Sequence, residues 1–242
     1  MKRVLSIFMI FALVFSLASC KGKDVPPPTP VIEESNHFKE FKDENGRVIF
    51  TVDVTIPQIT DDCDPKIAEY LNGIALDVFN DACQFAESNL ESAAKSETPW
   101  SKNITFETTL LNNRYACFLM SDFSSIHGDI PIIETICFDV QKGEQCFLND
   151  FATYPEDPES SFEFFLNDTL APVLPKEFHH PEYITDEVLG RLDEIVDPGN
   201  FYLTEDGMGF YFNKNHVHQY LKGIYKITFK WQELAGNYEL PR

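Results

Sequence analysis

A long apolar stripe of helical period lies between two groups of strand-like segments, and it limits the folds open to this chain. The stripe follows Asp64-Pro65, where Asp is a favoured N-cap and Pro a favoured first helical residue. Its members recur at intervals of three and four and line one face: Ile67, Tyr70, Leu71, Ile74, Val78, Phe79, Ala82, Phe85, Ala86 and Leu90. We therefore expect one long helix that packs with this face on a sheet.

Strand-like segments flank this helix and are spaced as hairpins. Asn45-Gly46 is a strong turn signal within 37–56, where apolar residues recur at every second position from Val48 to Ile56. Downstream we expect strands at 104–111, 115–123 and 130–140, a turn at 142–143, helices at 160–174 and 185–195, strands at 201–204 and 208–212, a helical turn near 216–221, and a last strand at 225–231. Hairpins with helices inserted between them favour an α+β fold, an antiparallel sheet that carries the long helix.

The first twenty residues are typical of an export signal. Lys2 and Arg3 precede an apolar run, and small residues lead to Cys20. The run is shorter than the roughly 20 residues that span a bilayer, and its end resembles the lipobox of bacterial lipoproteins. We predict cleavage before Cys20 and lipid attachment at Cys20, where two acyl chains hold a protein stably on a membrane. An ordinary secretory signal that happens to carry a cysteine is the alternative.

The remaining chain divides into a tether and two halves. Residues 1–19 are the signal peptide, and 20–36 comprise the lipidated cysteine and an extended, Pro-rich tether. Residues 37–142 hold the hairpin, the long helix and a meander, and 143–242 form a C-terminal half that we expect to be one compact unit with the preceding half. No later segment is apolar enough to cross a membrane. The predicted location is the bacterial cell envelope, facing the periplasm or the exterior.

The net charge limits the kinds of molecule that this chain is expected to bind. The chain has 19 Lys plus Arg against 39 Asp plus Glu, a formal charge of −20. The leader carries two cations, so cleavage leaves −22. Such a surface repels phosphate backbones, so we expect no nucleic-acid partner, and it attracts cationic proteins. Acidity that serves only solubility is the alternative.

Five cysteines follow Cys20, and their number is odd. They are Cys63, Cys83, Cys117, Cys137 and Cys146. Cys117 and Cys137 lie at comparable distances on either side of a turn near His127, which makes them candidate cross-strand neighbours and a candidate disulfide. Buried free thiols are the alternative, because free cysteine is commonly a core residue. Without a Cys-x-x-Cys pair, zinc-ribbon and thioredoxin-like sites are not predicted.

Motifs for catalysis and metal binding are missing from the sequence. His179-His180 are adjacent, and His216 and His218 are two apart, so neither pair has the spacing of a helical zinc motif. There is no Gly-x-Ser-x-Gly elbow and no phosphate-binding glycine loop. Carboxylates are so abundant that no single pair can be chosen as a glycosidase site. We predict no catalytic residues, no metal and no cofactor.

Aromatic residues crowd the C-terminal third of the chain. In a half-buried hairpin, alternation places about half of them on the core side. We assign Tyr202, Tyr211 and Tyr220 to the exposed side as candidate ligand-binding residues, since exposed aromatic side chains favour binding. Core packing is the alternative for each of them.

The C-terminal segment resembles a known domain family. The residues that carry the resemblance are Phe201 to Gly207, Phe210 to Asn213, Gly223 and the closing strand to Leu234, preceded by Phe138-Asp139-Val140, Gly143 and Leu148 to Phe151. They are similar to the RsiV-like domain. That domain forms the ectodomain of lysozyme-sensing anti-sigma factors, and it also occurs beside peptidoglycan deacetylase domains and in bacterial lipoproteins of unknown function.

The resemblance implies a class of ligand. It suggests a lysozyme-like protein or a peptidoglycan-related ligand, and it makes His127 a candidate ligand-binding residue. Members of the family commonly carry Gly-Gly-Ala-His at this point, where this chain has Ser124-Ser125-Ile126-His127. Serine and isoleucine resist backbone conformations that glycine adopts, so the loop differs from the family pattern.

These observations together predict a lipid-anchored, non-catalytic binding module of the bacterial envelope. The alternatives are an envelope hydrolase that acts on cell-wall carbohydrate and a structural lipoprotein of an envelope complex. A closed pocket with convergent carboxylates would favour the hydrolase. An exposed aromatic patch beside an acidic face would favour protein binding.

Overall fold

The computed structural model describes residues 29–59, 65–126, 128, 130–153, 157–178, 181–213 and 223–240. Several of the predicted features lie outside these ranges: the leader with Cys20, the tether to residue 28, Cys63, His127, His179-His180, His216, His218 and Tyr220. Among the helices that are described, none has the length and apolar character needed to cross a membrane.

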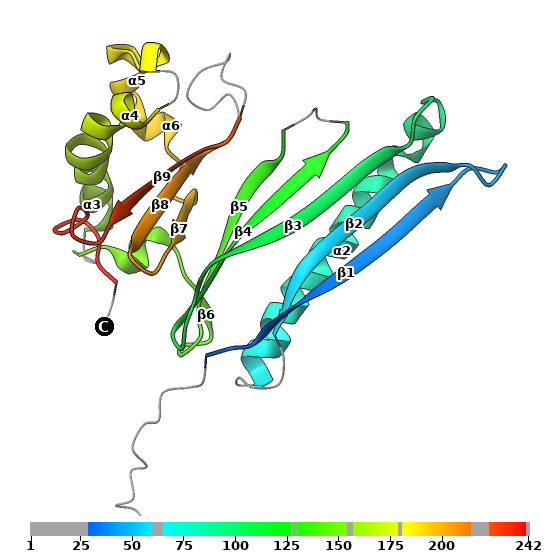
Figure 1. Cartoon of the computed structure of the whole chain (residues 1–242), viewed down its shortest axis with the longest axis horizontal. Helices are drawn as coiled ribbons and strands as arrows, with labels where there is room; N and C mark the ends of the chain where they lie inside the picture. The colour runs from blue at the N-terminus through cyan, green and yellow to red at the C-terminus, as the bar shows by residue number, and fades with distance from the viewer. Residues whose placement is uncertain are drawn as a thin grey trace, which may run out of the picture.

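The first part of the fold is a six-stranded sheet in sequence order, backed by a helix (Figure 1). Its elements are β1 (Ile32–Lys42), β2 (Val48–Ile59), α2 (Pro65–Ala94), β3 (Trp100–Leu111), β4 (Tyr115–Ser124), β5 (Ile132–Asp139) and β6 (Glu144–Gln145). All neighbouring strands are antiparallel except β2 and β3. The helix α2 returns the chain to the end where β2 began, so β3 runs parallel to β2. The expectation of a purely antiparallel sheet is therefore wrong at this pair.

The first hairpin turns at the predicted residues but begins earlier than expected. Gly46 has φ of +81°, and the Asp43 carboxylate accepts hydrogen bonds from the backbone N–H groups of Asn45 and Arg47 at 2.9 and 3.0 Å. Strand β1 starts at Ile32, which is paired with Ile59 of the long β2. The end of the segment assigned to the tether is thus part of the sheet, because β2 offers backbone partners along that whole length.

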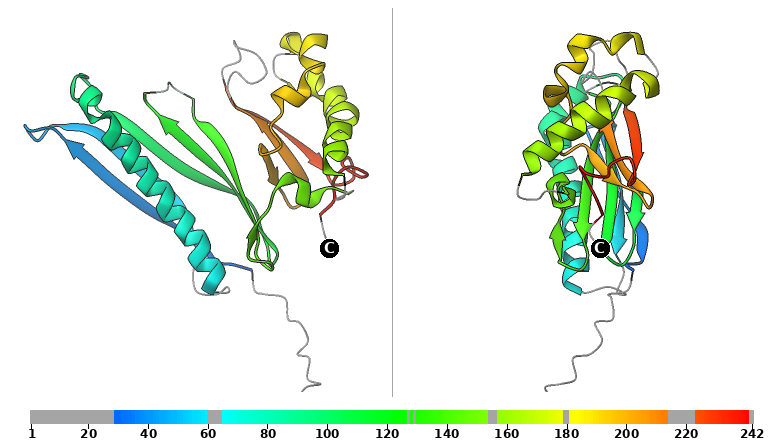
Figure 2. Two further views of the ribbon diagram at one scale, coloured as in Figure 1. Left: turned by 180° about the vertical axis from the view of Figure 1, so that it is seen from behind. Right: turned by 90° about the vertical axis from the view of Figure 1, so that its left-hand side faces the viewer.

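The helix α2 packs its apolar face on β2, β3 and β4. Ala82, Cys83 and Ala86 are buried against Val52, Val54 and other strand residues in one apolar cluster. Phe85 contacts the Phe50 ring edge to face, with 6.4 Å between ring centroids. Seen from behind, α2 runs across β1, β2 and β3 (Figure 2). One face of this part of the sheet is therefore occupied by the helix.

The second part of the fold is a small sheet covered by short helices. The sheet contains β7 (Phe201–Leu203), β8 (Gly207–Phe212) and β9 (Tyr225–Lys230), all antiparallel. The helical segments are η1 (Leu148–Phe151), α3 (Pro158–Phe164), the π-helical η2 (Phe165–Leu170), α4 (Ala171–Glu177), η3 (Pro181–Tyr183), α5 (Asp186–Leu189) and α6 (Leu192–Ile195). The single helix expected over 185–195 is two short ones, because Gly190 caps α5 and Arg191 leaves helical geometry.

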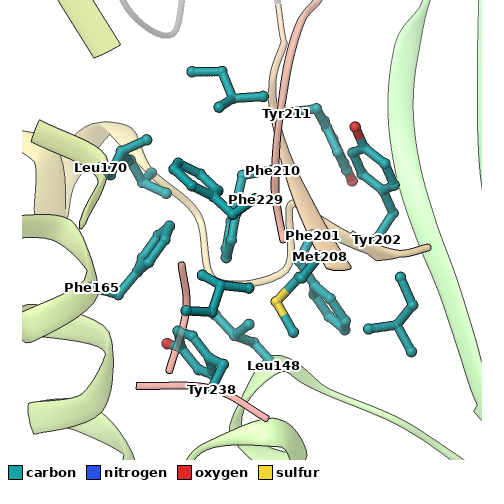
Figure 3. Packing of buried hydrophobic residues seen from close by; sticks show 14 of the residues in the cluster. Leu148, Phe165, Leu170, Phe201, Tyr202, Met208, Phe210, Tyr211, Phe229 and Tyr238 are labelled. Carbon is teal, nitrogen blue, oxygen red and sulfur yellow. The ribbon is translucent and has the colours of Figure 1, made fainter. Parts of the chain in front are cut away.

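The small sheet lies between the helices and the six-stranded sheet, so both of its faces are buried (Figures 1 and 3). On the helix side, the ring of Phe165 stacks on Phe210 at 4.4 Å between centroids. On the other side, the Tyr211 hydroxyl lies 3.2 Å from Thr135 Oγ1 of β5. The largest apolar cluster accordingly contains residues from before and after position 142.

This burial overturns the exposed positions predicted for two tyrosines. Tyr202 and Tyr211 are 6% and 1% exposed. The Tyr202 hydroxyl is hydrogen-bonded to Thr228 Oγ1 at 2.8 Å, and burial raises the pKa of Tyr211 to about 12. Neither ring can meet a ligand in this fold. The alternation rule failed because it assumes one solvent face, whereas every residue of β7 and β8 is buried.

A third tyrosine gives a test of this core. The Tyr238 hydroxyl is buried and has no hydrogen-bond partner among the described residues. A buried hydroxyl without a partner is unfavourable, so Tyr238→Phe should leave the free energy of unfolding unchanged or raise it by up to about 1 kcal/mol. Tyr211→Phe removes a paired hydroxyl and should lower it by about 1 kcal/mol. Urea unfolding of both variants checks this order, and the reverse order would contradict the assignment of partners.

Candidate functional site

The second face of β1, β2 and β3, opposite α2, is the largest surface of the sheet left open by the described elements. In Figure 1, α2 lies behind these strands and the small sheet lies beside β4 and β5. We call this surface the open face. It comprises Glu34, Asn36, Phe38 and Glu40 of β1, Thr51, Asp53 and Thr55 of β2, and Ser101, Asn103, Thr105 and Glu107 of β3. Each of these side chains is exposed or half-buried.

Phe38 is the one apolar residue among those named for the open face, and it lies on the edge strand β1. It is 56% exposed, and in the register it is opposite Asp53, which in turn is paired with Asn103. The Asn36 amide donates hydrogen bonds to Asp53 Oδ1 at 2.9 Å and to Thr55 Oγ1 at 3.2 Å. These bonds join the Asn36 side chain of β1 to two side chains of β2. The exposed aromatic ring therefore has amide, hydroxyl and carboxylate side chains as its neighbours on this face.

The open face is acidic in its centre and has lysines only at its margins. Its carboxylates belong to Glu34, Glu40, Asp53 and Glu107. Lys42 lies 3.0 Å from Glu40 at the hairpin end, and Lys226 of β9 lies 2.7 Å from Glu107 where the small sheet begins. Exposed ion pairs of this kind contribute little to stability. The carboxylates of Glu40 and Glu107 can therefore exchange these lysines for cations of a partner.

No motif in the sequence marks the open face, but the period-2 alternation of the first hairpin is a signal that could have found it. His37 and Phe41 face α2, as shown by the contact of the His37 ring with Phe79 at 5.2 Å. Phe38 must then lie on the opposite face, because neighbouring side chains of a strand point in opposite directions.

A smaller cleft of about 240 Å³ lies at the β5–β6 end of the same sheet. We call it the β5–β6 cleft, and its lining includes Tyr115, Asp139, Lys142, Cys146, Phe147 and Asp150. Its carboxylates belong to Asp139, Glu144 and Asp150, and those of Asp139 and Asp150 are engaged in structure. Asp139 is 2% exposed, accepts hydrogen bonds from two backbone N–H groups of the turn, and lies 3.7 Å from Arg114 and Lys142. Asp150 accepts a hydrogen bond from the Phe147 N–H at 2.7 Å.

Three thiols lie side by side behind this cleft. Cys117 and Cys137 are directly opposite in the β4–β5 register, as the predicted cross-strand neighbours. Both are free thiols here, so the candidate disulfide between them is not formed in this structure. Cys146 donates its backbone N–H to the Cys137 carbonyl at 2.8 Å, and it too is a free thiol. Within the described residues, no group of His, Cys, Asp or Glu has an arrangement that would hold a metal ion.

Part of the chain is similar to a known protein family. Residues 149–232 match a family model described as "Protein of unknown function (DUF3298)". Comparison with curated proteins gives no match.

Two crystal structures of DUF3298 family proteins share the fold. A protein from Bacteroides fragilis NCTC 9343 superposes with a TM-score of 0.57 and 14% identity, over 88% of this chain and 96% of that chain. One from Pseudomonas aeruginosa PAO1 has a TM-score of 0.54 and 14% identity, over 90% and 97%. At this level of identity the likeness concerns the fold alone.

Proposed function

We propose that this chain is a lipid-anchored, non-catalytic binding module of the bacterial cell envelope, and that its open face binds a cationic protein of the lysozyme class. The lipobox-like leader that ends in Cys20 supports the location. The resemblance of the C-terminal motif to the RsiV-like domain supports the class of ligand. The charge of −20 supports a cationic partner, since complementary fields steer association.

The observation that carries the proposal is the exposure of the Phe38 ring on the open face. Binding hot spots are enriched in large aromatic side chains that become fully desolvated at the middle of an interface. Phe38 is 56% exposed and has the carboxylates of Glu40 and Asp53 nearby on the same face. A cationic protein would bury the ring and place its Lys or Arg side chains against these carboxylates. Such charge-assisted contacts specify orientation and partner.

A peptidoglycan-related glycan is the second candidate ligand for the same surface. The specific observation is the row of hydroxyl and amide side chains beside Phe38, such as Asn36, Thr55 and Asn103. A sugar ring has apolar C–H faces and many hydroxyl groups, so it can stack on an aromatic ring and exchange hydrogen bonds with Asn and Thr. The charge of the face does not contribute to this alternative, and we therefore rank it second.

The hydrolase alternative receives no support from the β5–β6 cleft. An inverting or retaining glycosidase needs two carboxyl groups that are free to act on substrate. Asp139 accepts hydrogen bonds from the backbone of its own turn and lies beside the Arg114 and Lys142 side chains. Asp150 accepts a hydrogen bond from the Phe147 N–H at the start of η1. A structural lipoprotein would instead copurify with one fixed partner and bind neither lysozyme nor glycan.

The central test is the binding of lysozyme to a Phe38 variant. The exported form of the chain, with Cys20→Ser so that no lipid is attached, should bind one lysozyme molecule saturably in calorimetry at physiological salt. Phe38→Ala should weaken this binding by about 30-fold, the loss typical of a central aromatic contact. The matched control is Phe164→Ala on α3, whose ring is 59% exposed but lies far from the open face in the fold. This control should bind as the unmodified chain does.

Two results would refute the proposal. Equal binding by Phe38→Ala and the unmodified chain would place the contact elsewhere. Binding that disappears between low and physiological salt in both proteins would be attraction of net charges alone. If lysozyme does not bind but soluble peptidoglycan fragments do, with the same dependence on Phe38, the second candidate replaces the first.

A further inference from the structure

A row of three thiols crosses three neighbouring strands. Cys117 of β4 is opposite Cys137 of β5, and Cys146 follows β6 in the position that continues the Phe138–Gln145 pairing. Residues directly opposite in an antiparallel pair have Cα atoms about 4.5–5.5 Å apart, which is within the range that a disulfide requires. Both neighbouring pairs of the row, 117 with 137 and 137 with 146, are therefore placed for a bond.

The register places the side chain of Cys137 next to those of both Cys117 and Cys146, because residues opposite each other in an antiparallel pair point to the same face of the sheet. At the inner end of the row, Cys117 Sγ accepts a hydrogen bond from the Leu203 N–H of β7 at 3.3 Å. Hydrogen bonds to both neighbours, together with burial, raise the pKa of the Cys137 thiol.

Only one end of the row reaches solvent. Cys117 and Cys137 are fully buried, with no exposed surface, whereas Cys146 is 7% exposed and lines the β5–β6 cleft. The cleft is large enough for a small molecule, and its other ionic groups are Asp139, Lys142, Glu144 and Asp150. With three carboxylates and one ammonium group, it disfavours an anionic reagent and accepts an uncharged one.

We propose that Cys146, Cys137 and Cys117 form a thiol–disulfide relay, in which Cys146 reacts with a small uncharged disulfide in the β5–β6 cleft and the resulting bond moves inward to Cys137 and Cys117. This is a modification site separate from the open face, and it does not depend on what the open face binds.

The chemistry balances with an external disulfide R–S–S–R as the oxidant. The Cys146 thiolate, having released its proton to water, attacks one sulfur of R–S–S–R and expels R–S⁻, which takes up a proton. The Cys137 thiol then attacks Cys146 Sγ, expels the second R–S⁻ and gives its proton to that leaving group. Finally the Cys117 thiol attacks Cys137 Sγ, and its proton goes to the departing Cys146 sulfur, so that Cys146 is released as a thiol. The protein loses two electrons and two protons, and the external disulfide becomes two R–SH molecules.

The test uses bis(2-hydroxyethyl) disulfide on the folded chain in which Cys20 and Cys63 are replaced by Ser. Samples are quenched by alkylation and each cysteine is located by peptide mass spectrometry. We expect a transient hydroxyethylthio adduct on Cys146, followed by an internal Cys117–Cys137 disulfide with Cys146 free. Cys137→Ser should trap the adduct on Cys146. Cys146→Ser should form the internal disulfide at least about tenfold more slowly, since attack requires access to the thiol.

The matched control is Cys83→Ser, because Cys83 is also a buried free thiol, 8% exposed, but it belongs to α2 and lies outside the row. This variant should oxidise at the same rate as the parent. The proposal is overturned if Cys146→Ser forms the internal bond as fast as the parent. It is equally overturned if the adduct forms on Cys83 first, or if Cys146 keeps its adduct while Cys137 and Cys117 remain thiols.

Discussion

Replacement of Phe165 by Ala is expected to lower the free energy of unfolding by about 3–5 kcal/mol, the usual cost of removing a fully buried phenyl ring. Phe165 has no exposed surface and is the first residue of η2. Its ring stacks on Phe210 at 4.4 Å and meets Phe229 and Tyr238 edge to face, both at 5.7 Å between centroids. The ring therefore joins the helical layer to β8, β9 and the C-terminal segment.

The neighbouring residue supplies the control for this prediction. Phe164 is 59% exposed, so Phe164→Ala should change the free energy of unfolding by less than about 0.5 kcal/mol. Both variants are compared by denaturant unfolding, monitored by circular dichroism. A loss below about 1 kcal/mol for Phe165→Ala would mean that the site collapses around the missing ring. In that case the helices are not fixed on the small sheet as described.

Gly207→Ala is expected to lower the free energy of unfolding by at least about 3 kcal/mol, at or beyond the upper end of overpacking costs. A Cβ atom on Gly207 would lie 1.8 Å from the Phe229 carbonyl oxygen and 2.9 Å from Lys230 Cα. These are backbone atoms of β9, which is paired with β8 at this point. They cannot rotate away as a side chain can, so the two strands would have to separate.

The same substitution on α2 should have the opposite sign. Gly73 is in the helix, and a Cβ atom there would meet nothing within 4 Å. Because alanine favours the helix over glycine, Gly73→Ala should raise the free energy of unfolding by about 0.5–1 kcal/mol. Thermal unfolding of both variants gives the comparison. If Gly207→Ala proved as stable as Gly73→Ala, β8 and β9 would not approach as closely as the structure has them.

Local signals identified much of the secondary structure. Asn45-Gly46 marked the first turn, and Gly46 does have a positive φ. The runs predicted at 115–123 and 225–231 correspond within a residue or two to β4 and β9. Helical period between 67 and 90 falls inside α2. Each of these patterns is short in range, because a turn, an alternation or a helical face depends on residues close together in the chain.

Contacts between distant segments had no such signal. The parallel pairing of β2 with β3 depends on the end of the sheet to which α2 returns the chain. The burial of Tyr202 and Tyr211 depends on a second layer that covers the small sheet. The exposure of Phe38 follows from the lack of such a layer over β1 and β2 among the described residues. Tyr211 is buried and Phe38 is exposed although both lie in hairpins. The layers that pack around each strand decide which of its faces is in contact with water.

The sequence by itself determined the charge, the lipobox-like leader, the α+β class and the cross-strand position of Cys117 and Cys137. The tertiary structure alone decided that Cys146 completes a row of thiols, that Asp139 and Asp150 accept hydrogen bonds from nearby backbone N–H groups, and that Phe38 is exposed on the open face. The physical reason is that charge and local periodicity are properties of neighbouring residues, whereas burial, cleft lining and accessible surface arise only when segments far apart in the chain pack together.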